Sequence, residues 1–341
     1  MMRYLAFVLL LFVLGSCKKN RFKKSEFLES LYDLEIKPEV ENGVSAIETF
    51  NTSWANYVAS PTLANLDLVK TDLQSTVQKL EEISIFNLGD VSKTYVYNRM
   101  FKTKIDTALL IDNYNEGTTF TSSDVTGFTN PTKGIYALEY LLYSSSFRDS
   151  TEVVKFQSFF TAMQENLLTT FQDFQTNWET YRGTFIEQTD EGVGGSYNIV
   201  VNRVVHVLED VTKKRITEPL DLEDPILMPG FRSNQGVLNV LAIVSKLKKV
   251  YYGNGLSGDF NSISVNVRKK NKKLSESIDE KFEMVDNLGL ALTENDTYYF
   301  ETSSGALDEY NTALKELLTL IKIDVIQELG IILTFGDTDG D

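Results

Sequence analysis

The segment between residues 151 and 182 constrains the fold most, because it runs without a proline or a glycine and repeats apolar residues at helical spacing. Apolar side chains three or four positions apart lie on one face of an α-helix. The aromatic members of this face are Phe156, Phe159, Phe160, Phe171, Phe174 and Trp178. The spacing therefore predicts one long amphipathic helix whose aromatic face is buried in a core.

The same periodicity recurs along most of the chain, which contains only six prolines among 341 residues. Scarce proline favours long helices over a β protein with many turns. Further helices are expected at residues 39–57, 61–86, 93–113, 134–143, 197–214, 234–252, 259–292 with one or more breaks, and 304–329. Since no segment shows convincing strand alternation, the sequence predicts an all-α fold.

A glycine-rich, acidic stretch at residues 183–196 separates the expected helices into two sets of similar length. Two such sets predict two helical-bundle domains in series. The expected order is a lipoprotein signal peptide (1–17), a tether and entry to the first helix (18–37), an N-terminal bundle (38–184), a linker (185–196) and a C-terminal bundle (197–341).

The charge and the scarce histidine and cysteine exclude several classes of site. A formal net charge of −15 repels phosphate backbones, so no nucleic-acid partner is expected. One cysteine cannot form an internal disulfide, and one histidine cannot supply the two or three imidazoles common in zinc hydrolases. Any metal site would use oxygen ligands, which suit iron, manganese, calcium or magnesium.

The first residues have the pattern of an export signal. Arg3 precedes an apolar run from Leu5 to Leu14, which has the length of a signal-peptide core and is too short to span a bilayer. The run ends in Leu-Gly-Ser-Cys, which resembles the lipobox of bacterial lipoproteins, with Cys17 as the lipidated residue. The alternative is a chance cysteine behind a plain signal peptide. The basic segment after Cys17 reads as a tether near a membrane surface, so we expect an exported protein anchored by lipid in the cell envelope, at the outer membrane.

Six segments occur in this order along the chain: "SPTLANL", "EEISIFNLGDV", "KGIYALEYLLY", "NIVVNRVVHVLEDVTKKRITEPL", "KKVYYGNGLSGDF" and "ELGIILTFGDTDGD". Together they resemble the imelysin family of bacterial envelope proteins, which includes insulin-cleaving metallopeptidases and iron-regulated proteins. The resemblance covers nearly the whole mature chain. It implies an all-helical fold of two bundles with a site at the domain interface.

The segment "KGIYALEYLLY" falls where the family carries a Gly-x-His-x-x-Glu motif. Gly134 and Glu139 match the motif, but Tyr136 stands in place of the histidine. Tyr136 and Glu139 are three apart and share a helical face, so they could form an oxygen pair suited to a ferric ion or another ligand. The alternative is a lost site, in which Tyr136 packs its ring and donates a hydrogen bond to Glu139.

His206 and Glu209 repeat this spacing on another helix. If the two bundles face each other, these residues could join Tyr136 and Glu139 in one site at the interface. The alternative is a half-buried histidine that is hydrogen-bonded to Glu209.

Two functions from different classes follow. One is a membrane-tethered binding protein without catalytic activity, whose ligand is a metal ion, an iron complex or a peptide. The other is a metallopeptidase of the family type, in which Glu139 is the remaining candidate for the general base. The missing motif histidine favours the binding protein. The oligomeric state and the identity of the ligand are not determined by the sequence.

Overall fold

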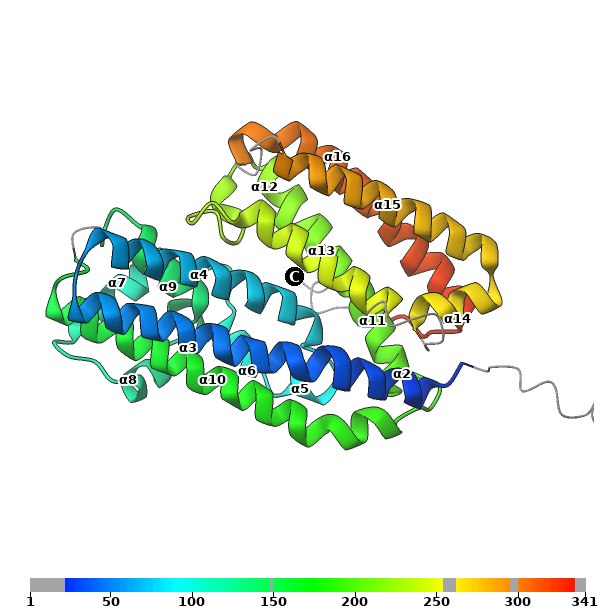
Figure 1. The fold of residues 1–341 in the computed structure, drawn as a ribbon, viewed down its shortest axis with the longest axis horizontal. Helices are drawn as coiled ribbons and strands as arrows, with labels where there is room; N and C mark the ends of the chain where they lie inside the picture. The colour runs from blue at the N-terminus through cyan, green and yellow to red at the C-terminus, as the bar shows by residue number, and fades with distance from the viewer. Residues whose placement is uncertain (1–21, 148–149, 254–261, 295–299, 335–341) are drawn as a thin grey trace, which may run out of the picture.

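The structure is a computed structural model that describes residues 22–147, 150–253, 262–294 and 300–334 (Figure 1). Cys17, residues 18–21 of the proposed tether and the C-terminal residues 335–341 lie outside these ranges. Within them every regular element is a helix, which confirms the all-α fold. The elements before residue 188 are α2 (Lys24–Leu31), η1 (Tyr32–Ile36), α3 (Lys37–Ala59), α4 (Leu63–Ile83), η2 (Ser84–Phe86), α5 (Gly89–Lys93), α6 (Val96–Met100), α7 (Thr107–Glu116), α8 (Ser122–Thr126), η3 (Asn130–Thr132), α9 (Ile135–Tyr143) and α10 (Val154–Glu187).

The second half begins at Ser196, so the connection after α10 is shorter than the linker expected at 185–196. Its elements are α11 (Ser196–Glu209), η4 (Asp210–Thr217), α12 (Glu218–Asp221), η5 (Pro225–Leu227), α13 (Gly236–Tyr252), α14 (Ile263–Lys270), α15 (Lys272–Glu294), α16 (Phe300–Thr319), η6 (Leu320–Val325) and α17 (Ile326–Leu329). The expected break between residues 259 and 292 falls at Asn271, between α14 and α15.

The long helices form two layers that follow the order of the chain (Figure 1). Helices α3, α4 and α10 lie side by side in one layer, and α13, α15 and α16 belong to the other. Helix α4 contacts α13 across the two layers, and η2 contacts both α11 and α13. Buried side chains of both halves belong to one continuous hydrophobic cluster. The division into two bundle domains therefore stays a prediction.

The aromatic face of α10 is buried, as its spacing predicts. Phe156, Phe159, Phe160, Phe171 and Phe174 are inaccessible to solvent, and Trp178 is 1% exposed. The Trp178 indole also donates a hydrogen bond of 3.1 Å to the carbonyl of Phe86. Helix α10 packs against α3 and against the short helices α2, α5, α6, α8 and α9.

The prediction of a single helix at residues 93–113 is wrong. Three short helices, α5, α6 and α7, cover this part of the chain. Tyr95 has a positive φ of 54° and ends the first of them, and Asp106 starts the third by accepting a hydrogen bond from the amide of Leu109. The irregular backbone between these helices is covered by α10, which contacts both α5 and α6.

Candidate functional site

Gly134 fixes the start of the motif helix α9. It has a φ of 86°, and a Cβ at this position would lie 2.4 Å from the carbonyl oxygen of Met100. Positive φ is strained for residues with side chains, and real Cβ atoms do not approach an oxygen that closely. The glycine of the motif is therefore explained by local geometry: it lets the start of α9 lie against the end of α6.

Tyr136 is buried on α9 and donates a hydrogen bond to Glu81 Oε1. The sequence-based alternative, a bond from Tyr136 to Glu139, is therefore wrong. Burial raises the pKa of Tyr136 well above its ordinary value, and the nearby Glu81 raises it further, so the side chain is a neutral phenol. A neutral phenol is a poor ligand for a ferric ion, since iron ligation by tyrosine requires the phenolate.

Glu81, at the C-terminal end of α4, is the common acceptor of this site and is completely buried. Its Oε1 also accepts a hydrogen bond of 2.6 Å from Arg215 Nη1. Burial raises the pKa of the Glu81 carboxyl, while the charge and hydrogen bond of Arg215 oppose the rise. Because α4 belongs to the first half and η4 to the second, this pair joins the two layers across the motif helix.

The π-helical segment η4 positions Arg215. In a π-helix the hydrogen bonds run to the fifth residue, so side chains five apart come together. Arg215 Nε accordingly donates to Asp210 Oδ2 at 2.7 Å, within the same segment. The guanidinium is held by one carboxylate on its own helix and by another on α4.

Glu139 has partners of its own, from the segment that leads into α13. Its Oε1 accepts hydrogen bonds from the Ser233 amide at 3.0 Å and from the Ser233 hydroxyl at 2.5 Å. Burial raises the pKa of the Glu139 carboxyl, and the bonds from Ser233 oppose that rise. Tyr136 and Glu139 therefore lie one turn apart but bind different groups.

His206 and Glu209 are also divided between different partners. His206 Nε2 lies 2.8 Å from the carbonyl oxygen of Thr334, and Glu209 pairs with Lys322 on η6. The expected hydrogen bond between His206 and Glu209 is therefore wrong. Both residues hold the C-terminal elements against α11.

A metal held by these side chains does not fit the arrangement. The hydroxyl of Tyr136 and the carboxylate of Glu139 are directed to Glu81 and Ser233 instead of to one shared point. In the ranges that the structure describes, no group of three or more histidine, cysteine, aspartate or glutamate side chains is placed to hold an ion. The four candidate ligands are thus parts of separate polar contacts.

A pocket of about 460 Å³ opens beside this network, between the segment 84–103 and the helix pair α11 and η4. Three cationic residues, Lys102, Arg203 and Arg215, line it, together with the single carboxylate of Asp210. His206 contributes to the same wall. The pocket thus has more basic than acidic side chains although the whole chain has a net charge of −15, which favours an anionic or strongly polar ligand.

Two residues of the pocket carry buried polar atoms that lack a hydrogen-bond partner. They are the hydroxyl of Tyr97 and the Oδ1 atom of Asn87. Burial raises the pKa of Tyr97 well above its ordinary value, so its hydroxyl is a neutral donor. Sequence reasoning missed both residues. Tyr97 lies in a segment expected to be an ordinary helix, and Asn87 lies in the segment "EEISIFNLGDV", to which only a family resemblance and no site role was given.

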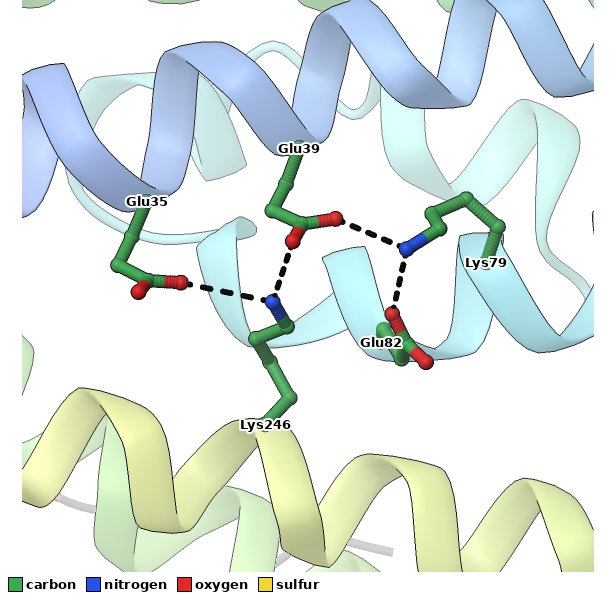
Figure 2. Close-up of polar contacts among 5 residues, drawn as sticks. All are labelled: Glu35, Glu39, Lys79, Glu82 and Lys246. Atoms are coloured by element: carbon green, nitrogen blue, oxygen red, sulfur yellow. Dashed lines mark hydrogen bonds and ion pairs between the residues drawn. The ribbon is translucent and has the colours of Figure 1, made fainter. Parts of the chain in front are cut away.

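A second charged network joins the layers and includes Lys79 and Glu82, which flank Glu81 at the end of α4 (Figure 2). Lys246 of α13 donates to Glu39 Oε1 at 2.7 Å and lies 3.4 Å from Glu35 Oε2. Lys79 binds the other oxygen of Glu39 at 3.0 Å and Glu82 at 2.7 Å. The ammonium groups of Lys79 and Lys246 each lie between two carboxylates. Because these lysines already occupy the place of a cation, the network joins the helices and does not form a metal site.

Comparisons with known proteins agree with this fold. An imelysin-like protein from Psychrobacter arcticum superposes with a TM-score of 0.74 at 15% identity, covering 92% of this chain and 97% of that one. A protein from Parabacteroides distasonis, given the name iron-regulated protein A precursor, superposes with a TM-score of 0.76 at 12% identity and the same coverage. No curated protein matches the sequence significantly. A sequence model of the imelysin family, however, matches residues 37–321, and the chain belongs to that family.

Proposed function

We propose that this chain is an exported, lipid-anchored binding protein of the bacterial cell envelope, and that the pocket beside α9 holds a small, anionic, oxygen-rich molecule. One observation carries the proposal: Tyr97 lines the pocket, and its buried hydroxyl has no hydrogen-bond partner. A buried donor without an acceptor costs roughly 1–3 kcal/mol. A bound molecule with an oxygen atom at this point removes that cost.

The charges of the pocket support the anionic class. Arg203 donates to the carbonyls of Ser84 and Ile85 at 2.6 and 3.3 Å, which fixes its guanidinium at the wall. Arg215 is already paired with Glu81 and Asp210, so Lys102 and Arg203 are the cations that the pocket offers to a ligand. Fixed cations lose little conformational entropy when they bind a carboxylate or a phosphate.

We propose that iron is part of the bound ligand and is not a cofactor held directly by the protein. One structural relative bears the name iron-regulated protein A precursor. The described side chains do not assemble a direct metal site, but a ferric ion wrapped in carboxylates presents a negative, oxygen-rich surface. An anionic ferric complex is therefore the form of iron that suits this pocket.

The metallopeptidase alternative has less support. A metal-activated water needs a firmly held Lewis acid beside a general base. Tyr136 replaces the motif histidine and donates to Glu81, while Glu139 accepts from Ser233. Chelator-sensitive cleavage of a peptide by the pure protein, abolished by Glu139→Gln, would establish the peptidase.

The anchoring part of the proposal rests on the sequence around Cys17. None of the helices in the described ranges has the length and hydropathy required to cross a bilayer. A lipid on Cys17 would hold the body at a membrane by its N-terminal end, with the pocket in the aqueous compartment.

The binding proposal is tested by calorimetric titration of the wild type with citrate and with ferric citrate. Tyr97→Phe removes a hydroxyl that has no protein partner, so its folding stability should stay the same or rise slightly. Its affinity should fall about tenfold, because a hydrogen bond to a charged group contributes roughly 1.5 kcal/mol or more.

Tyr251→Phe is the matched control. Tyr251 also has a buried hydroxyl without a partner, and it does not line the pocket. The control should bind as the wild type does. Equal affinity in all three proteins, or absence of binding by the wild type, would refute the proposed ligand class.

A further inference from the structure

The structure brings two lysine-rich segments that are far apart in the sequence to one end of the molecule. Lys23 and Lys24 stand at the start of α2, and Lys269 and Lys270 end α14. All four line the same hollow of about 1260 Å³. Figure 1 shows this end, where α2 and α14 lie near each other.

This end is basic although the whole chain is strongly acidic. Five of the six residues from Arg268 to Lys273 are basic, and residues 18–25 contain five basic residues and no acidic one. Acidic side chains are present as well. Asp190 and Glu191 line the hollow, and exposed or half-exposed ion pairs join Lys23 to Glu26, Lys24 to Glu191, Arg268 to Asp279 and Lys272 to Glu276. The lysines of the hollow outnumber its acidic residues, and the tether adds further positive charge from Lys18, Lys19 and Arg21.

The origin of the tether is fixed to the body at the same place. The ring of Phe22 lies 5.1 Å from that of Tyr197 and 6.2 Å from that of Phe27, measured between centroids. An extended chain spans at most about 3.6 Å per residue, so Cys17 lies within about 18 Å of Phe22. A lipid on Cys17 would therefore bring this end close to the headgroups, at a distance comparable with about two Debye lengths.

Apolar side chains accompany the charges. Leu329 and Ile331 line the hollow, and the neighbouring Ile332 is 50% exposed. The carbonyl of Ile332 accepts hydrogen bonds from the side chains of Asn198 and Asn202, which hold this segment on α11. Basic and apolar groups on one face are the combination that binds an anionic bilayer surface.

We propose that this end of the molecule, formed by Phe22–Lys24, the 268–273 segment and Leu329–Ile332, is a docking surface for a bilayer that contains anionic phospholipid. The distance argument rests on the proposed lipid anchor, whereas the charge argument does not. Docking would orient the body on the membrane beyond what a flexible lipid tether alone does.

The test is co-sedimentation of the full chain with vesicles of phosphatidylglycerol and phosphatidylethanolamine, beside vesicles of neutral phosphatidylcholine. The double variant Lys269→Gln/Lys270→Gln should bind the anionic vesicles roughly ten- to thirtyfold more weakly, since each lysine near such a surface contributes about fivefold. Binding to neutral vesicles, which the apolar N-terminal segment can also support, should not change. Added salt should weaken the wild type's binding to anionic vesicles.

The matched control is Lys213→Gln/Lys214→Gln, which removes the same charge from exposed positions on η4, away from α2 and α14 (Figure 1). It should bind as the wild type does, and the charge-conserving variant Lys269→Arg/Lys270→Arg should also retain binding. Lys23→Gln/Lys24→Gln provides a second variant on the other segment. Equal losses in the patch and control variants, or no preference of the wild type for anionic vesicles, would overturn the proposal. These results are independent of ligand titrations and of fatty-acid labelling of Cys17, so either part of the proposed function can fail separately.

Discussion

Replacing Lys246 by methionine tests how the two layers are held together. The lysine side chain is 2% exposed, and its ammonium lies between Glu35 and Glu39, whose side chains are 4% and 17% exposed. Methionine keeps most of the aliphatic stem but removes the charge (Figure 2). It leaves Glu35 without its cation, whereas Glu39 keeps its contact with Lys79.

Removing one partner of a buried ion pair costs about 3–5 kcal/mol, because the remaining charge is desolvated and uncompensated. We expect Lys246→Met to lower the free energy of unfolding by this amount at neutral pH, measured by urea denaturation. Lys272→Met breaks the exposed contact with Glu276, and it should change stability by less than about 1 kcal/mol.

The loss should depend on pH with a defined sign. Burial raises the pKa of Glu35, and Lys246 opposes that rise, so the variant raises it further. A carboxyl whose pKa is higher in the folded state destabilises the protein above that pKa, and the effect disappears as the pH falls and both states are protonated. The pKa of Glu39 is lowered although burial opposes this, because hydrogen bonds from Lys246 and Lys79 stabilise the charged form. That stabilisation is lost as the pH falls through the pKa of Glu39 in the folded state. This loss also makes the difference in unfolding free energy between the variant and the wild type smaller at low pH.

The double variant Glu35→Gln/Lys246→Met removes the stranded charge and should recover most of the lost stability. A loss that is independent of pH, or that persists in the double variant, would refute the electrostatic explanation and point to lost packing of the lysine stem.

Three further predictions concern the motif and the anchor. Gly134→Ala should lower the free energy of unfolding in urea by about 3 kcal/mol or more, because the new side chain would meet both a positive φ and the Met100 carbonyl. The control Gly183→Ala places a Cβ in open space on α10 and should raise the free energy of unfolding by about 0.5–1 kcal/mol. Tyr136→His should not create a divalent-metal site, because position 136 faces Glu81 Oε1, which already accepts a hydrogen bond from Arg215. Tight binding in a cobalt titration would contradict this. Cys17→Ser should abolish fatty-acid labelling in cells, and equal label in the variant would rule out the lipoprotein.

The sequence was informative where a single helix carries the signal. The aromatic periodicity of residues 151–182 predicts α10 and its buried face, since local spacing alone decides which side chains share a face. The expected helix at 93–113 was wrong because its breaks depend on the left-handed backbone of Tyr95 and on support from α10. Neither appears as a proline or glycine in that segment.

The polar partners of the motif could not be predicted in the same way. The i, i+3 spacing correctly places Tyr136 and Glu139 one turn apart, but their partners Glu81 and Ser233 lie 55 and 94 positions away in the sequence. The π-register that brings Arg215 onto Asp210 also leaves no mark in the hydrophobic pattern. Long-range pairing of this kind depends on how the two layers pack against each other, which the local spacing of residues does not reveal.

On the proposed function, the ligand lies in the pocket at Tyr97 and not between the motif side chains. An anomalous-scattering map at the iron edge, from crystals grown with ferric citrate, would locate it. We predict one iron peak inside the pocket, on the side of Tyr97 and Arg203. A peak between Tyr136 and Glu139, or a map without any peak, would contradict it.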